Sequence, residues 1–275
     1  PAPVGNMVVG RVIRPDPDSD AHRFSPGELV YGYGAFGEES ALPTGRCRRL
    51  PTGVEWKDAV CLDPARFALA ALRDGGVRLG DRVAIFGLGA IGLVAVQLAR
   101  LAAAGVIIGV DPVPRRREIA GRLGAEELLD PATTDAGRRL KELTEGAGVD
   151  VAVDFSGSPQ ALQAALRGVA FGGTVVCAAF PAPYGGGLDF GAEAHINRPQ
   201  IIFSRANSDP NRDAPRWDHR RIEAQCATLL AEGAVRGEEI VDRVVDYPNL
   251  REAIHQAMAD PGWATKLGVR FPEEP

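Results

Sequence analysis

The sequence of 275 residues contains no apolar run long enough to cross a membrane and no apolar stretch near its start typical of a secretion signal. Its four cysteines lie far apart without a C-x-x-C pair, which argues against a disulfide framework and against a thiolate zinc site. A net charge of −5 provides no basic surface for nucleic acid or an anionic membrane. These absences predict a cytoplasmic protein with reduced thiols whose partner is a small molecule.

The middle of the chain alternates between apolar strands and helical segments. Continuous β-branched runs predict strands at 82–87, 105–111, 127–130, 149–157, 173–180 and 199–206. Helical spacing lies between them, at about 90–104, 114–124, 134–145 and 158–170. Such alternation predicts an α/β fold with a doubly wound parallel sheet.

The flanking segments have a different pattern. The pattern of residues 1–60 predicts short strands between turns, and the clearest of these strands are at 7–13 and 28–34. Helical spacing follows at 63–76 and returns in the C-terminal part at 214–233 and 250–260, before a closing strand at 265–271.

Three glycines join the first strand of the alternating region to its first helix with the spacing G-x-G-x-x-G. Gly87 would permit a tight turn, Gly89 would let the backbone approach a pyrophosphate, and Gly92 would let helix and strand pack closely. The helix start, at Ala90 and Ile91, would offer free N–H groups to the phosphates. The glycines alone could serve only a turn, but their place between strand and helix predicts a nucleotide site.

An acid at the end of the second strand of this region bears on the choice of cofactor. Asp111, followed by Pro112, is placed to bind the ribose hydroxyls of an adenosine and to repel a 2′-phosphate, which favours NAD over NADP. The arginines at 115–117 complicate this prediction. They could hold a 2′-phosphate, form a solvated helix start, or pack beside the adenine.

The stretches "GVRLGDRVAIFGLGAIGLVAVQLARLAAAGVIIGVDPVPRRREIAGRLGAEELLDP" and "GVDVAVDFSGSPQALQAALRGVAFGGTVVCAAF" resemble the cofactor domain of the medium-chain dehydrogenase/reductase superfamily, the zinc alcohol and polyol dehydrogenases. The arginine-rich "APRWDHRR" is similar to a compact branch, the bacteriochlorophyllide dehydrogenases. The resemblance implies a Rossmann domain at 67–204 and a reduced GroES-like domain formed by 1–66 with the returning segment 205–275. It also implies a homodimer formed through the edge strand "IIFSRA" of the cofactor sheet.

The resemblance implies further cofactor contacts, although each residue could equally be an ordinary core or surface residue. Ser156 would lie on the adenosine side, Arg116 beside the ribose, and Lys266 near the pyrophosphate. The main chain at Cys177, Ala178, Ala179, Phe203 and Ser204 would bind the nicotinamide carboxamide.

The sequence departs from the superfamily at the metal site. Asn6 stands where zinc-dependent members have a histidine ligand, and Met7 where they have a glutamate. The family's four-cysteine lobe and the segment with the first cysteine ligand are missing from this sequence. One carboxylate, Asp63, remains where polyol dehydrogenases often have Glu-Pro. Because a catalytic zinc needs about three protein ligands, we expect no metal in the active site.

Without zinc, a side chain must handle the proton of the substrate oxygen. Asp63 is the first candidate, although it could instead cap the helix that follows, with Pro64 at the first helical position. His195 is the second, because histidine titrates near neutral pH, although it could be a loop or helix residue satisfied by the backbone. Tyr33 and Tyr31 could donate to a substrate oxygen or pack in the interior.

Three functions are compatible with these residues. The first is a zinc-independent, NAD-linked oxidoreductase acting on a secondary alcohol or ketone of a small polar metabolite. The second is an epimerase or eliminating enzyme that keeps NAD tightly bound and oxidises its substrate only transiently. The third is a cofactor-binding protein without turnover.

Overall fold

The computed structural model describes residues 5–15, 23–184, 186–206 and 212–272. The chain divides into two compact units. Residues 64–224 form one of them, here named the sheet unit, and residues 1–63 with 225–275 form the other, here named the split unit. The chain thus passes between units near 63 and 225, whereas the sequence places these passages at 66 and 204.

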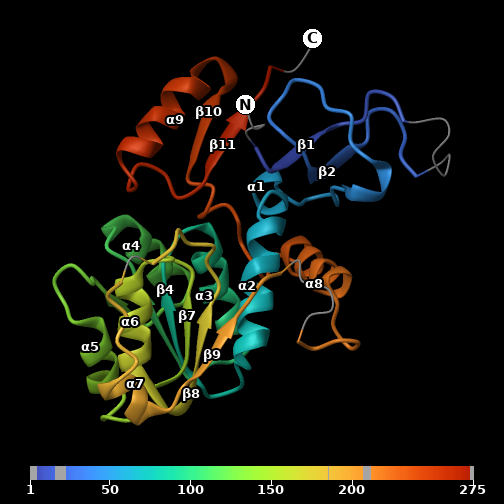
Figure 1. The fold of residues 1–275 in the computed structure, drawn as a ribbon. Helices are drawn as coiled ribbons and strands as arrows, with labels where there is room; N and C mark the ends of the chain where they lie inside the picture. The colour runs from blue at the N-terminus through green and yellow to red at the C-terminus, as the bar shows by residue number, and fades with distance from the viewer. Residues whose placement is uncertain (1–4, 16–22, 185, 207–211, 273–275) are drawn as a thin grey trace. The chain divides into compact units, whose positions relative to one another are not determined.

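The sheet unit contains a six-stranded parallel sheet in the order β6-β5-β4-β7-β8-β9. Its strands are β4 (Arg82–Phe86), β5 (Val106–Val110), β6 (Glu127–Leu129), β7 (Val149–Asp154), β8 (Val169–Cys177) and β9 (Gln200–Phe203). All six follow the runs of β-branched residues, and the predicted α/β fold with a doubly wound sheet is confirmed (Figure 1).

Helices cover both faces of this sheet. They are α2 (Leu62–Gly75), α3 (Ala90–Leu101), α4 (Pro114–Leu123), α5 (Ala136–Leu143), α6 (Pro159–Gly168) and the short α7 (Ala192–Asn197), which the sequence analysis does not predict. On one face, Ala84 and Phe86 pack with Leu140 of α5 and Leu166 of α6 in a buried cluster. The opposite face is approached by α2, whose Gly75 lies against the side chain of Val151.

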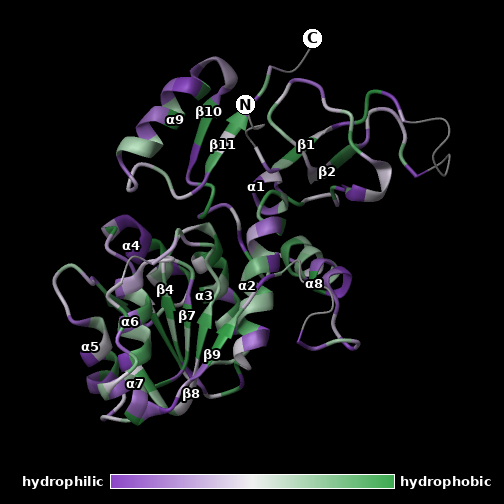
Figure 2. Ribbon diagram, in the orientation of Figure 1, coloured by the Kyte–Doolittle hydropathy of each residue, from purple (hydrophilic) through white to green (hydrophobic). Residues whose placement is uncertain are grey.

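This arrangement explains why the central strands contain continuous apolar stretches rather than alternating residues. Residues Val83 to Phe86 are at most 1% exposed because successive side chains enter two separate cores. Figure 2 shows the apolar colouring of the central strands and the mixed colouring of the covering helices. Within the described residues, no helix is both long and apolar enough to span a bilayer.

The split unit is smaller and built from short elements. An antiparallel sheet joins β1 (Met7–Arg11), β2 (Leu29–Tyr33) and β3 (Cys47–Arg49), and a parallel pair joins β10 (Arg243–Asp246) to β11 (Leu267–Arg270). The helices α1 (Trp56–Ala59), α9 (Leu250–Ala259) and part of α8 (His219–Ala231) complete it. All four cysteines of the chain are buried thiols.

Candidate functional site

The glycine-rich turn follows β4 and leads into α3. Gly87 has a φ of +85°, and a Cβ added there would lie 2.8 Å from the main-chain nitrogen of Ser156. A Cβ on Gly92 would collide with the carbonyl oxygen of Gly87. A Cβ on Gly89, in contrast, would meet nothing within 4 Å. Packing therefore requires the outer two glycines, while the middle one borders open space, which fits the approach of a pyrophosphate.

The first turn of α3 presents N–H groups beside that space that have no hydrogen-bond partner in the described part of the chain. Gly89 is the N-cap and makes no side-chain capping bond, and the N–H of Leu93 donates to the carbonyl of Gly89 at 2.9 Å. The N–H groups of Ala90, Ile91 and Gly92 precede this first intrahelical bond. Together with the positive end of the helix dipole, they suit a negatively charged phosphate.

Asp111 lies just after β5 and is 3% exposed. Its Oδ2 accepts the N–H of Leu88 at 2.8 Å, and its Oδ1 accepts the N–H of Val113 at 2.8 Å. The carboxylate thus ties the glycine-rich turn to the start of α4. Each carboxylate oxygen can accept a second bond, so the ribose hydroxyls retain acceptors.

The arginines after Asp111 differ in what they contact. Arg117 donates to the carbonyl of Asp111 at 2.6 Å and pairs with Asp130 at 3.1 Å, so it stabilises the start of α4. Arg116 places its guanidinium 3.8 Å from Oδ2 of Asp111. It therefore lies beside the acid, where the resemblance places it near the ribose, and its positive charge reduces the repulsion that Asp111 exerts on an anion.

A second buried acid, Asp154 at the end of β7, was missed by the sequence analysis. It is 1% exposed, and its Oδ1 accepts from the main-chain N–H of Ser156 at 2.8 Å and from the Ser156 hydroxyl at 2.6 Å. Burial raises the pKa of Asp154, and these hydrogen bonds oppose that shift. Asp154 thus fixes the Ser156 turn, which packs against Gly87. The available signal was an acid directly after a run of buried apolar residues, as at Asp111.

The ends of β8 and β9 carry the main-chain groups expected to bind the carboxamide. The N–H of Ser204 donates to the carbonyl of Cys177 at 3.0 Å, and the N–H of Ala178 donates to the carbonyl of Asp154 at 2.9 Å. These groups already have partners within the sheet, whereas Phe203 is 82% exposed. Burial, followed by the nearby Asp154 carboxylate, raises the pKa of Cys177 to about 11, so its thiol stays protonated at neutral pH.

Five predicted residues or groups therefore meet at one edge of the sheet, because the strands are parallel and each is followed by one of them. They are the glycine-rich turn, Asp111, Ser156, Cys177 with Ala178 and Ala179, and Phe203 with Ser204. The carboxyl-terminal edge of a doubly wound sheet is where such folds bind their ligands.

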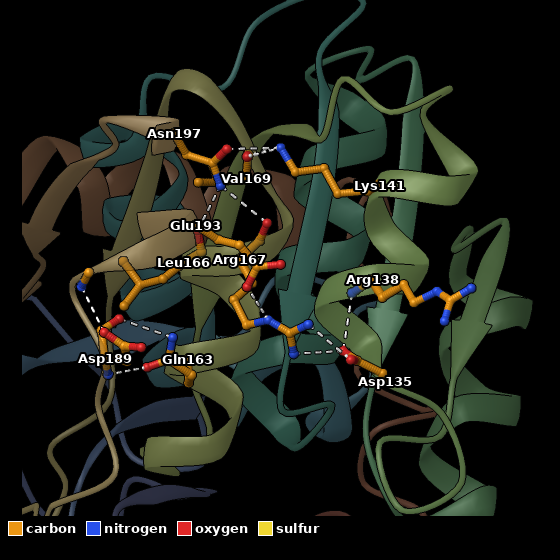
Figure 3. A network of polar contacts seen from close by, with 11 residues as sticks. Asp135, Arg138, Lys141, Gln163, Leu166, Arg167, Val169, Asp189, Glu193 and Asn197 are labelled. Carbon is orange, nitrogen blue, oxygen red and sulfur yellow. Dashed lines mark hydrogen bonds and ion pairs between the residues drawn. The ribbon is translucent and has the colours of Figure 1, made fainter. Parts of the chain in front are cut away.

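His195 is not brought to that edge. It lies in α7, and Asn197 of the same helix donates to the carbonyl of Leu166 at 3.1 Å and accepts from Lys141 at 3.1 Å (Figure 3). Lys141 also donates to the carbonyl of Val169, the first residue of β8, at 2.8 Å. These bonds hold α7 where the strands begin, opposite the glycine-rich turn. His195 thus lies away from the other predicted site residues of this unit, and its role as an acid or base stays a prediction.

Asp63 belongs to the split unit. Helix α2 begins at Leu62, so Asp63 lies in the first turn rather than at the N-cap, which corrects the alternative reading of this residue. Its Oδ2 accepts a hydrogen bond from Nδ2 of Asn6 at 2.6 Å. Met7 starts β1 with its side chain 6% exposed, opposite Tyr33 in the strand register. Tyr31 is 7% exposed and packs in the interior.

Lys266 also belongs to the split unit, whereas the glycine-rich turn belongs to the sheet unit. Its charge acts on the buried Cys61, whose pKa rises to about 12 chiefly because of burial, with Lys266 opposing the rise. Among the described residues, no group of three or more His, Cys, Asp or Glu side chains is arranged to hold a metal ion.

Comparison with known proteins agrees with this geometry. A family model described as zinc-binding dehydrogenase matches residues 90–208. The D-guloside 3-dehydrogenase of Escherichia coli (strain K12) is 46% identical over 272 residues, spanning 98% of this chain and 77% of that protein. The alcohol dehydrogenase TADH from Thermus sp. ATN1 has the same fold, with a TM-score of 0.76 at 23% identity over 98% of this chain and 84% of that one. A short-chain alcohol dehydrogenase from Escherichia coli CFT073, solved in complex with NADH, has the same fold with a TM-score of 0.78. Its sequence identity is 18%, and the match covers 96% of this chain and 82% of that one.

The fold, the glycine-rich turn and these matches define an oxidoreductase with a Rossmann-type cofactor domain. More narrowly, the chain belongs to the zinc alcohol dehydrogenase-like group of the medium-chain dehydrogenase/reductase superfamily. The resemblance to this superfamily, stated from the sequence, is thereby confirmed.

The second and third glycines of the turn allow a test of the cofactor position. Gly89→Ala should weaken NADH binding by about tenfold or more, because its Cβ enters the space beside the phosphate donors, while the unfolding temperature stays unchanged. Gly92→Ala should instead lower the free energy of unfolding by about 1–3 kcal/mol through overpacking. Fluorescence titration and thermal melts measure both effects. Wild-type affinity in Gly89→Ala would show that the pyrophosphate does not cross this turn.

Proposed function

We propose that this protein is an NAD-linked, zinc-independent oxidoreductase that interconverts a secondary ring hydroxyl of a sugar glycoside and the corresponding ketone. The observation that carries the proposal is the side chain of Asp63, whose Oδ2 is bonded to Asn6 and whose other carboxylate oxygen has no hydrogen-bond partner among the described residues. The substrate class is supported by the similarity to D-guloside 3-dehydrogenase along nearly the whole chain.

The chemistry needs an acceptor for the hydroxyl proton. Bound NAD supplies the acceptor for the hydride that leaves the carbinol carbon. Asp63 takes the hydroxyl proton on Oδ1, which makes no hydrogen bond with any described residue, while Oδ2 stays bonded to Asn6. In the reverse direction Asp63 returns this proton to the new alkoxide oxygen.

The residues at the superfamily's metal-ligand positions do not fit a zinc ion. The Nδ2 group of Asn6 is a donor and already contacts Asp63, so it cannot offer a lone pair there. The side chain of Met7 is buried in the interior and is a poor zinc ligand compared with a thiolate, imidazole or carboxylate. We therefore propose that side chains alone handle the substrate proton.

The choice of NAD follows from Asp111. We expect NADH to bind about tenfold or more tightly than NADPH, because a buried carboxylate at the ribose position disfavours a 2′-phosphate. Asp111→Ser should narrow this difference, and Arg116→Ala should widen it by removing the neighbouring positive charge. Fluorescence titrations with both cofactors measure this. Equal affinities in the wild-type protein would mean that Arg116 overrides the acid.

The proton role of Asp63 is tested by Asp63→Asn, which keeps the shape of the side chain but removes the base. Turnover should fall by about a hundredfold or more, while NADH affinity and unfolding temperature are retained. His195→Ala is the control and should stay active, since α7 lies at the opposite edge of the sheet from the glycine-rich turn. Elemental analysis should find no stoichiometric zinc in any of the three proteins.

Three outcomes would contradict these assignments. Normal turnover in Asp63→Asn would remove its role as the base. Loss of turnover in His195→Ala would show that the reaction requires His195. One zinc per chain would refute the metal-free mechanism.

We also propose that two copies of the chain associate through β9. This strand ends the described sheet, and Ile201 and Phe203 on it are 39% and 82% exposed. An exposed apolar edge strand invites pairing with another strand. Beside it lies a surface hollow of about 450 Å³, lined by Phe190, Ala194, His195, Arg198, Pro199 and Ile201, which suits side chains from a second copy.

Light scattering at micromolar concentration should give a dimer for the wild-type protein. Ile201→Lys should yield monomers because it places a charge on the edge strand. Leu79→Lys is the matched control, because Leu79 is 81% exposed but lies outside the sheet. The Leu79→Lys variant should therefore still form dimers. A monomeric wild-type protein would disprove association through this edge.

A further inference from the structure

We propose that Asn6 and Asp63 act together as a clamp for two neighbouring hydroxyls of the substrate. Asp63 binds the hydroxyl that is oxidised, and Asn6 binds the hydroxyl on the adjacent carbon. The inference rests on the proposed function and narrows its substrate class to vicinal diols. It makes Asn6 a residue that determines specificity.

The backbone fixes the position of Asn6. Its carbonyl accepts the N–H of Gly34, just beyond the end of β2, at 3.0 Å, and Met7 then enters β1 as a buried residue. Gly5, which precedes it, has a φ of +108°, and a Cβ there would lie 2.6 Å from the main-chain nitrogen of Phe36. Only glycine suits that position, so the chain enters β1 along one defined path.

Asp63 is fixed from the other side. It lies in the first turn of α2, between the fully buried Cys61 and Leu62 on one side and the buried Pro64 and Ala65 on the other. Its own side chain is partly exposed. The 2.6 Å bond from Asn6 therefore joins two side chains whose backbones are held independently. A clamp built in this way needs little reordering when a ligand arrives.

The pair retains unused hydrogen-bonding capacity. Within the described residues, Oδ1 of Asp63 and Oδ1 of Asn6 have no hydrogen-bond partner, and Nδ2 of Asn6 has a second N–H. The side chain of Asn6 is exposed to solvent. The amide can thus donate to one hydroxyl oxygen or accept its proton, while the carboxylate accepts the proton of the next hydroxyl.

The spacing of the pair suits a diol. Two gauche hydroxyls place their oxygens about one hydrogen-bond length apart. The bond between Nδ2 of Asn6 and Oδ2 of Asp63 keeps the amide and the carboxylate directly adjacent, so neighbouring hydroxyls can reach one group each. A substrate without the second hydroxyl leaves the Asn6 amide unpaired beside apolar ring carbons. Loss of such a bond lowers kcat/KM for the analogue, because the polar group of the site is left without its hydrogen-bond partner.

The test combines a change in the protein with a change in the substrate. The probes are methyl α-D-guloside and its 2-deoxy and 4-deoxy analogues, assayed with NAD as kcat/KM for wild-type protein and Asn6→Ala. Wild-type protein should prefer the parent glycoside over one deoxy analogue by about tenfold or more. Asn6→Ala should reduce kcat/KM for the parent glycoside by a similar factor. For that deoxy analogue, the kcat/KM of Asn6→Ala should stay within about threefold of the wild-type value.

Two more variants separate the clamp from a general effect on the fold. Asn6→Asp keeps the shape but sets a second carboxylate against Asp63, so activity on all three glycosides should fall. Asn249→Ala is the matched control, because Asn249 is an exposed asparagine of the same unit without a side-chain capping bond. It should match wild-type protein on every probe.

The outcomes distinguish the clamp from the function on which it rests. If Asn6→Ala lowers kcat/KM equally for the parent and both analogues, or if wild-type protein uses all three equally, the clamp is wrong and the oxidoreductase assignment stands. If wild-type protein binds NADH but oxidises none of the three glycosides, the proposed function itself fails, and the clamp fails with it.

Discussion

The close approach of α3 to the end of β4 is the constraint on which the cofactor edge depends. The space that a Cβ of Gly92 would need is filled by the carbonyl of Gly87, so the helix can begin only where it does. That position aims the first N–H groups of α3 into the space bordered by Gly89. The donors for a phosphate are therefore a product of helix–strand packing rather than of any side chain.

Two buried carboxylates complete this edge in the same way. Asp111 joins the glycine-rich turn to the start of α4, and Asp154 shapes the turn at Ser156 that packs against Gly87. Each lies at the end of a strand whose buried residues are otherwise apolar. Backbone N–H groups that would otherwise lack partners near the ends of parallel strands are thereby satisfied, and three consecutive turns acquire a fixed geometry.

The elements of the sheet could be predicted because each depends on local composition. The runs at Val83, Ile107 and Val151 are buried on two faces, so they are apolar without interruption, and the glycine spacing marks the turn. The position of His195 could not be predicted, because it depends on bonds from Asn197 to residues some thirty positions earlier in the chain. The contact between Asn6 and Asp63 spans 57 positions and leaves no periodic signal either.

The burial of the four cysteines has a chemical consequence for the protein as a whole. Oxidants and alkylating reagents attack the thiolate, and burial keeps Cys61 and Cys177 protonated, with pKa values raised to about 12 and about 11. Cys177 closes the strand beside Asp154, so a reactive thiol there would expose the cofactor edge to inactivation. At these two positions the folded chain instead presents sulfur as an apolar atom of low reactivity.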